Sequence, residues 1–284
     1  MSLTDVRALI IDMDGVLWEG NRPFPGLTEF FAALRELQIK FVLATNNASQ
    51  TPEQYVARLA GFGVTIARAE VLSSAQAAAL HLAQAASNGK RVFAIGEAGV
   101  QRAFSEQGFT LTDLYDVSAQ YVVVGMDRAI SWDKLATATL NIRAGARFIG
   151  TNPDRTLPTE RGLTHGNGAI LAALQAATGV APTIIGKPEP TMYQIAMQRL
   201  GVKAEHTVAI GDRLDTDILG AVRAGLRSIL VLSGVSTPDD VARSDFKPTW
   251  VKRDIQEITE QLRKGAAEKG SKGGFTLPPG PAAP

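Results

Sequence analysis

The sequence predicts an α/β protein built on a doubly wound parallel sheet, with a second α/β domain inserted into it. Short apolar runs rich in β-branched residues alternate along the chain with amphipathic helical stretches, and this order of elements is typical of parallel α/β sheets. The runs lack strict polar–apolar alternation, as expected of strands that helices cover on both faces. Polar clusters follow several of the runs, at the strand ends where a doubly wound sheet binds its ligands.

The predicted strands are the apolar runs, and the predicted helices lie between them. In chain order the strands are Ala8–Ile11, Phe41–Ala44, Val92–Ile95, Tyr121–Val124, Phe148–Ile149, Thr183–Ile185, Val208–Ile210 and Ile229–Leu232. The helical stretches repeat apolar residues at helical spacing, which gathers those residues on one face of each helix. They cover Leu27–Leu37, Glu53–Leu59, Ala75–Ala85, Leu135–Ala144, Ala169–Ala177, Met192–Leu200 and Ile218–Ala224.

The positions of the polar clusters predict two domains. Residues 90–182 have their own strand–helix alternation and separate the polar cluster at Thr45 from the one at Lys187. Gly89 and Pro182 lie at the two ends of this insert, and both residue types often interrupt regular secondary structure. We therefore predict a discontinuous Rossmann-like core at residues 1–87 and 184–262, and an inserted α/β domain at residues 88–183. Residues 263–284 are rich in Gly, Ala, Lys and Pro, which predicts a disordered tail.

Composition excludes several classes of function. The 284 residues contain 45% hydrophobic and 20% charged residues and no cysteine, so thiolate catalysis, zinc–thiolate sites and iron–sulfur clusters are excluded. A net charge of +1 gives no reason to expect a nucleic-acid partner. No apolar run approaches the roughly 18 residues of a membrane span, and the N-terminus lacks the pattern of a secretion signal. We therefore expect a cytoplasmic protein with no membrane partner.

The first polar cluster is Asp12-Met13-Asp14-Gly15, at the end of the strand Ala8–Ile11. Side chains two residues apart in a strand point the same way, so the two carboxylates would converge outside the sheet. Converging carboxylates repel one another unless a cation or a proton lies between them. Hard oxygen ligands of this kind suit Mg²⁺. Taken alone, the same residues are also typical of a turn or a helix N-cap.

The last polar cluster runs from Gly211 to Asp217, after the strand Val208–Ile210. Asp212 ends this strand and is expected to face the same crevice as the first cluster. Asp217 falls near the first turn of the next helix, where the helix dipole favours an aspartate whatever its function. The cluster therefore supplies one strong and one weaker candidate for an acidic site.

Thr45-Asn46-Asn47 and Lys187 are candidates for binding an anion. Strand-end hydroxyl and backbone N–H groups are able to hold a phosphoryl oxygen, although the same three residues also form plain turns. Lys187, within Gly186-Lys187-Pro188, is able to neutralise a phosphate and a neighbouring carboxylate, or to be a solvated surface lysine. Both alternatives stay open when each cluster is considered alone.

Taken together, in this order and at four strand ends, the clusters resemble the four motifs of the haloacid-dehalogenase superfamily, over about residues 5–262. Within this superfamily, three segments resemble the NagD-like phosphatases of subclass IIA. They are Asp12–Trp18, Thr151-Asn152-Pro153-Asp154 and Gly186-Lys187-Pro188. These proteins carry an α/β cap between their second and third motifs, where the insert is predicted here. In one departure, the family usually has Pro before the Gly-x-Gly of the cap helix, and this chain has His165 there.

The resemblance implies a role for each cluster. Asp12 would attack phosphorus and form an aspartyl-phosphate, and Asp14 would protonate the leaving oxygen and then activate water. The ligands of Mg²⁺ would come from Asp12, the backbone carbonyl of Asp14, Asp212 and, in support, Asp217. The phosphate would be bound by Thr45, Asn46, Asn47 and Lys187.

We therefore expect a Mg²⁺-dependent hydrolase of small phosphorylated metabolites, with a catalytic core and a cap. Members of the subclass differ in substrate, among them sugar phosphates, nucleoside monophosphates, phosphoglycolate and pyridoxal phosphate. Two alternatives are a phosphotransferase to a non-water acceptor and a non-catalytic sensor of a phosphorylated metabolite. The sensor is disfavoured because a binder has no need of both Asp12 and Asp14. Caps of this subclass often carry a dimer contact, so we also expect a homodimer through the cap.

Overall fold

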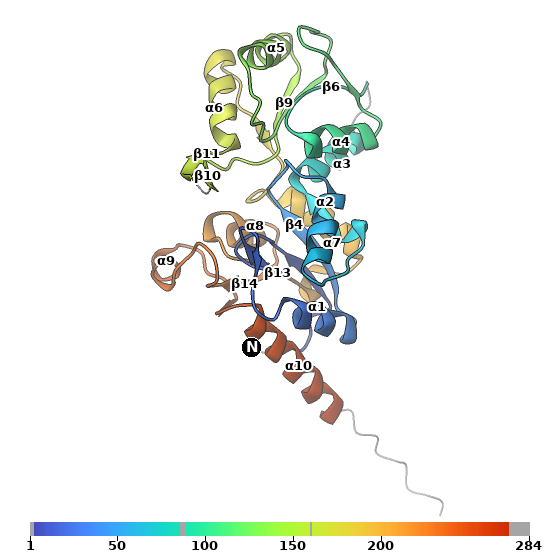
Figure 1. Ribbon diagram of the computed structural model, residues 1–284, viewed down its shortest axis with the longest axis vertical. Coiled ribbons are helices and arrows are strands. Elements are labelled where there is room, and N and C mark those ends of the chain that lie inside the picture. Colours follow the sequence, from blue (N-terminus) through green and yellow to red (C-terminus); the bar gives the residue numbers. More distant parts are fainter. Residues whose placement is uncertain (1–2, 86–88, 160, 273–284) are drawn as a thin grey trace, which may run out of the picture.

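A computed structural model describes residues 3–85, 89–159 and 161–272 of the chain. It confirms the predicted fold class, because its main sheets are parallel and helices flank them (Figure 1). One sheet has six strands and the other has five. In the view of Figure 1 the five-stranded sheet lies above the six-stranded one, and the C-terminal helix α10 projects below.

The six-stranded sheet carries the strand ends that matter for function. Its strand order is β15-β14-β13-β1-β4-β5 and every neighbouring pair is parallel. The strands are β1 (Ala8–Ile11), β4 (Lys40–Thr45), β5 (Val71–Ser73), β13 (Thr207–Gly211), β14 (Arg227–Val231) and β15 (Trp250–Lys252). The two edge strands, β5 and β15, were not predicted, because three residues are too few to show a pattern.

Alternate residues of β1 face opposite layers of helices. Leu9 and Ile11 belong to a cluster with α1 (Leu27–Glu36), α2 (Pro52–Gly61) and α10 (Ile255–Lys272). Ala8 and Ile10 belong to a cluster with α3 (Ser74–Ala85), α7 (Pro190–Leu200) and α8 (Leu219–Arg223). Both faces of the central strand are therefore buried, which explains why its sequence is a continuous apolar run.

The five-stranded sheet is built from the inserted part of the chain. Its order is β12-β9-β8-β6-β7, and all neighbours are parallel. The strands are β6 (Arg91–Ile95), β7 (Thr110–Leu111), β8 (Tyr121–Val124), β9 (Arg147–Gly150) and β12 (Thr183–Ile184). Helices α5 (Trp132–Arg143) and α6 (Asn167–Thr178) cover one face, and α4 (Ala98–Glu106) covers the other.

One hydrophobic cluster extends through both sheets. It runs from Ala8 and Ile10 of β1 through Leu82 of α3 to Val123 of β8. The backbones also meet where α4 begins, since the Gly99 N–H donates to the Ser49 carbonyl over 3.1 Å. A Cβ atom at Gly99 would overlap the carbonyl oxygen of Ala48. The insert is thus packed directly on the chain that follows β4.

One predicted domain limit differs from the observed sheets by one residue. Strand β12 pairs Ile184 with Gly150 of the five-stranded sheet, so Ile184 belongs with the insert although we predicted it in the core. The other limit, between residues 87 and 88, lies outside the described residues. The division into two domains itself stays a prediction.

The structure differs from the prediction at the C-terminus. Helix α10 continues to Lys272, so residues 263–272 are helical, although the predicted disordered tail begins at residue 263. Gly265 is buried, and a Cβ atom there would lie 3.3 Å from the Thr4 side chain. This stretch contains Ala, Glu and Lys, which favour helix, whereas the proline residues of the predicted tail lie beyond it, after residue 272. Residues 273–284 of the predicted tail lie outside the described residues.

Shorter elements complete the described part of the chain. A hairpin of β2 (Trp18–Glu19) and β3 (Arg22–Pro23) follows β1, and a hairpin of β10 (Thr156–Thr159) and β11 (Gly162–His165) precedes α6. A π-helical turn (Leu214–Ile218) leads into α8, and α9 (Pro238–Arg243) follows β14. Within the described ranges, no helix is long and apolar enough to cross a membrane.

Candidate active site

The candidate residues gather at the carboxyl end of the six-stranded sheet. Asp12 directly follows β1, Thr45 ends β4 and Asp212 directly follows β13. Because β1 lies between β13 and β4 in the sheet, these strand ends are neighbours. The π-helical turn after β13 adds Asp217. The sequence therefore identified strand ends that do meet in space.

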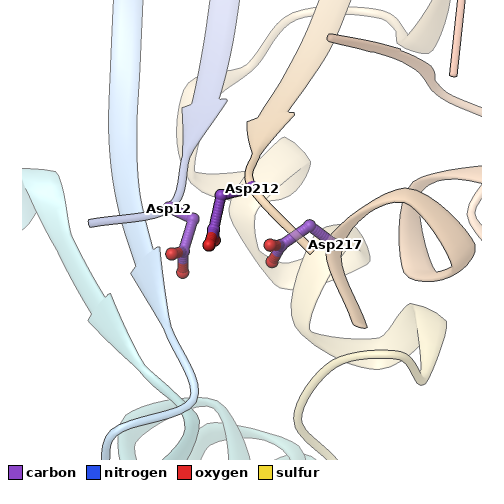
Figure 2. A group of neighbouring side chains, drawn as sticks. All are labelled: Asp12, Asp212 and Asp217. Atoms are coloured by element: carbon purple, nitrogen blue, oxygen red, sulfur yellow. The ribbon is translucent and has the colours of Figure 1, made fainter. Parts of the chain in front are cut away.

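Asp12, Asp212 and Asp217 form one carboxylate cluster. Figure 2 shows the three side chains directed toward a common space, and one oxygen of each lies within 4.8 Å of the others. Asp212 is fixed by the Val235 N–H, which donates to its Oδ2 over 2.8 Å. The side chain of Asp217 accepts from the Arg213 N–H at 3.1 Å. Such a cluster of oxygen donors suits a small divalent cation.

Glycines make room for this cluster. A Cβ atom at Gly15 or at Gly234 would overlap the carboxylate of Asp212, and a Cβ atom at Gly211 would overlap Asp217. Gly15 also has φ +79°, which side chains rarely adopt. The sequence alone does not indicate a role for Gly234, because its place beside Asp212 depends on the loop after β14.

The electrostatics of the cluster indicate excess negative charge. Burial, followed by the neighbouring carboxylates, raises the pKa of Asp12 well above its ordinary value, against the attraction of Lys187. Burial and then the charge of Asp217 raise the pKa of Asp212 to about 7. A bound cation would relieve both effects.

Lys187 is the positive group inside the site. Its side chain is 3% exposed, and its Nζ donates to an oxygen of Asp12, to Oδ1 of Asp217 at 2.7 Å and to the Ala44 carbonyl at 3.0 Å. Burial alone would lower the pKa of Lys187, but the carboxylates of Asp12 and Asp217 raise it well above its ordinary value. Of the two alternatives considered from the sequence, Lys187 is therefore not a solvated surface lysine.

Asp14 lies beside the carboxylate cluster but is not one of its members. Its side chain is exposed and accepts a 2.8 Å hydrogen bond from the indole Nε1 of Trp18. Exposure suits a group that exchanges protons with substrate and water. The sequence does not predict the contact of Trp18 with Asp14, because this contact depends on the turn between them.

Thr45, Asn46 and Asn47 form a turn with its own hydrogen bonds. The Thr45 hydroxyl accepts from the Asn47 N–H at 3.0 Å, and Oδ1 of Asn47 accepts from the Ser49 hydroxyl at 2.7 Å. Oδ1 of Asn46 accepts from the Lys187 N–H at 2.8 Å, and its Nδ2 donates to the Lys187 carbonyl at 2.9 Å. The Asn46 amide therefore joins this turn to the lysine loop.

The insert reaches the site through the segment after β9. Asn152 donates from Nδ2 to the Asn46 carbonyl over 2.8 Å, and Asn46 Nδ2 lies 3.3 and 3.4 Å from the two carboxylate oxygens of Asp154. Burial is the main cause that raises the pKa of Asp154. His165, at the end of β11, is exposed. The structure thus brings Asn152 and Asp154 to the site.

Comparison with known proteins places this geometry in a family context. A family model described as haloacid dehalogenase-like hydrolase matches residues 9–110, and a second, HAD-hydrolase-like model matches residues 184–258. The two matched segments contain the strand ends described above. The acid sugar phosphatase of Staphylococcus saprophyticus is 36% identical over 262 residues, which are 92% of this chain and 100% of that protein.

Solved structures are similar along most of the chain. NagD from Escherichia coli has 37% identity and a TM-score of 0.82, and the match covers 89% of this chain and 98% of NagD. The glycerol phosphate phosphatase of Mycobacterium tuberculosis, solved in complex with magnesium, has 36% identity and a TM-score of 0.84. That match covers 91% of this chain and 78% of the relative.

Proposed function

Because this chain belongs to the haloacid dehalogenase-like hydrolases, as a NagD-like phosphatase of subclass IIA, we propose that it hydrolyses small phosphomonoesters with Mg²⁺ through an aspartyl-phosphate on Asp12. Hydrolysis of phosphoric monoesters is the activity of the family, and the metal and the intermediate are the proposed part. The observation that carries them is the carboxylate cluster of Asp12, Asp212 and Asp217 around the ammonium group of Lys187.

The residues present fit a magnesium ion. The donors are carboxylate oxygens within 4.8 Å of one another, and burial, followed by the neighbouring carboxylates, raises the pKa values of Asp12 and Asp212. We propose that Asp12, Asp212 and the backbone carbonyl of Asp14 hold the ion and that Asp217 supports them. Bound there, Mg²⁺ would neutralise the negative charge that develops on the transferring phosphoryl group.

The reaction takes place in two steps. In the first, a carboxylate oxygen of Asp12 forms a bond to phosphorus while the bond to the leaving oxygen breaks, and Asp14 gives that oxygen a proton. In the second, Asp14 takes a proton from water, whose oxygen attacks phosphorus and releases Asp12 and inorganic phosphate. Splitting a difficult hydrolysis in this way is what a carboxylate nucleophile contributes. Lys187 holds the attacking group and offsets charge in both steps.

The proposed phosphate site uses the turn after β4. The Thr45 oxygen accepts from the Asn47 N–H and its hydroxyl also lies beside that of Tyr55, so we propose that the Thr45 O–H turns to donate to a phosphoryl oxygen when substrate binds. The side-chain amide of Asn46 is occupied by Lys187 and Asp154, so we propose that Asn46 acts through its backbone and by holding the lysine loop. Contacts of Asn47 and Lys187 with phosphate stay predictions.

The substrate class follows from the relatives. Those compared above carry the names acid sugar phosphatase and glycerol phosphate phosphatase, and 4-nitrophenylphosphatase is the name of another from Thermotoga maritima. We propose that the substrates are phosphomonoesters of sugars and small polyols. A homodimer through the cap and a cytoplasmic location stay predictions.

Three measurements test this function. Phosphate release from 4-nitrophenyl phosphate should require Mg²⁺ and stop on chelation. Rapid acid quenching during turnover of ³²P-labelled substrate should trap an acid-stable, hydroxylamine-sensitive phosphoprotein. With added alcohols, the phosphoryl group should still be released as inorganic phosphate. Transfer of the phosphoryl group to the alcohol would instead favour the phosphotransferase. Metal-independent turnover would contradict the proposed function.

A further inference from the structure

Trp18 contacts one of the reacting groups, and the chemistry above gives it no role. We propose that Trp18 is a positioning residue, whose indole N–H, clamped by Arg58, fixes the carboxyl group of Asp14 for proton transfer to the leaving oxygen. This inference rests on the proposed function of Asp14 as the proton donor. It concerns how an exposed acid keeps a defined orientation.

The contrast in exposure between the two residues is the first observation. Asp14 is exposed, whereas Trp18 is fully buried at 0%. An exposed carboxylate is free to sample several rotamers. A 2.8 Å bond to Oδ1 from an indole that cannot move removes this freedom. The turn between the two residues is closed by the Gly15 N–H, which donates to the Trp18 carbonyl over 2.8 Å.

Helix α2 supplies a clamp for the indole. The guanidinium carbon of Arg58 lies 4.3 Å from the centroid of the Trp18 ring, a cation–π geometry. An Arg58 N–H also donates to the Gly20 carbonyl on the hairpin that carries Trp18. The Phe62 ring lies 6.1 Å from that of Trp18 and inclined to it at 54°. The ring is therefore held by groups that do not belong to its own hairpin.

The indole distinguishes the two carboxyl oxygens of Asp14. An indole N–H is a donor and never an acceptor, and it holds Oδ1 at 2.8 Å. Oδ2 is therefore the oxygen that the indole leaves for the substrate, and we assign to it the proton that passes to the leaving group. A defined proton position matters because proton transfer needs the donor aligned with the leaving oxygen.

Two substrates with different leaving groups separate positioning from general damage. Glycerol phosphate releases an alkoxide, which needs a proton, whereas 4-nitrophenyl phosphate releases a stable phenolate. The parameter kcat/KM reports the steps up to departure of the leaving group. The variant Trp18→Phe keeps an aromatic ring and loses the N–H. We expect its ratio of kcat/KM for glycerol phosphate to that for 4-nitrophenyl phosphate to fall a few-fold to about tenfold, as for loss of one hydrogen bond to an uncharged carboxyl.

A matched control and an isosteric variant make the test decisive. Trp250→Phe removes a half-buried indole from β15, at the edge of the sheet, and should leave the substrate ratio unchanged. If Trp18→Phe does not fold, β-(3-benzothienyl)alanine at position 18 keeps the shape of the indole and replaces N–H by sulfur. It should reproduce the fall in the ratio. An equal loss on both substrates, or no loss, would overturn the inference.

Asp14→Asn distinguishes failure of this inference from failure of the proposed function. The amide cannot donate the carboxyl proton, so its ratio of kcat/KM values should fall at least as far as that of the Trp18 variants. If Asp14→Asn lowers the ratio and the Trp18 variants do not, only the positioning role is wrong. If Asp14→Asn leaves the ratio unchanged, the proton-donor function itself fails and the positioning role fails with it.

Discussion

Nζ of Lys187 and Oδ1 of Asp217 are 2.7 Å apart, and both side chains are 3% exposed. A buried pair of this kind is costly to break from one side, because the remaining charge keeps the penalty of burial without its partner. Lys187 also bonds Asp12, so its removal leaves two carboxylates without their cation.

Lys187→Met should therefore lower both stability and turnover. We expect the free energy of unfolding to fall by about 3–5 kcal/mol, the range for a broken buried ion pair. Urea unfolding in metal-free buffer measures this. The matched control is Lys203→Met, whose side chain is 84% exposed and should change stability by less than about 0.5 kcal/mol. Equal effects of the two variants would contradict the role of Lys187 in charge balance.

Asp12→Asn should abolish turnover and leave the fold intact. The amide keeps the size of the side chain, but it is a poor nucleophile and a weaker cation ligand. Acid quenching should trap a phosphoprotein on the wild type and none on the variant. Asp215→Asn is the matched control, because Asp215 is 69% exposed and pairs with Arg213. Retention of more than about a tenth of the wild-type rate, a loss under 1.4 kcal/mol, would exclude Asp12 as the nucleophile.

Stability of the metal-free protein should decrease between pH 5 and pH 8. The pKa of Asp12 is raised in the folded chain, and that of Asp212 is raised from 3.8 to about 7. At pH values between the unfolded and the folded pKa of each group, the folded chain therefore binds more protons than the unfolded chain. The free energy of unfolding then falls as pH rises through this window. Carboxyls with a lowered pKa, such as Asp5, finish titrating below about pH 5.

Thermal unfolding at several pH values, with and without Mg²⁺, measures this effect. We expect Mg²⁺ to raise the melting temperature more at pH 8 than at pH 5, because protons and the cation compete for the same oxygens. Asp212→Asn should remove much of the pH dependence. A melting temperature that is flat or rises from pH 5 to pH 8 would show that the cluster is not destabilising without metal.

His165→Pro should change substrate preference. Thr156 lies opposite His165, and the next hairpin bond is donated by the Gly166 N–H to the Arg155 carbonyl, so the N–H of His165 points away from its partner strand and proline is tolerated. We expect relative kcat/KM values among phosphomonoesters to change several-fold, since one lost hydrogen bond is worth about 0.5–1.5 kcal/mol. A decrease in kcat/KM by one common factor for all substrates would indicate that the loop acts as a lid. No change in any kcat/KM value would show that His165 does not contact substrate.

The fold was predictable in part where the sequence repeats a pattern over enough residues, although helices α4 and α10 were not predicted. The buried strand Ala8–Ile11 and the helix over Leu27–Glu36 were visible in the sequence. Strand β5 has three residues, too few for any period. The predicted helix at Ile218 is preceded by a π-helical turn that begins at Leu214. This turn carries Asp217, whose carboxylate lies within 4.8 Å of that of Asp212, an arrangement that no periodicity encodes.

The site was predictable as a set of strand ends and not as a set of contacts. Parallel strands bring their carboxyl ends to one edge, so Asp12 and Asp212 were expected to meet. Asn46 was expected to bind phosphate, and the bonds of its side-chain amide to both backbone groups of Lys187 were not predicted. This pairing joins residues 141 positions apart, and only the folded chain reveals it.

The backbone contact between Gly99 and Ser49 has a consequence for engineering. A cap transplanted from a relative would have to bring its own partner for the loop after β4, and it would otherwise expose the apolar cluster that α3 shares with both sheets. The cap is therefore a poor interchangeable module. New specificity is easier to obtain by point changes at exposed side chains near the site, such as Arg155 and His165, which leave the Gly99–Ser49 contact in place.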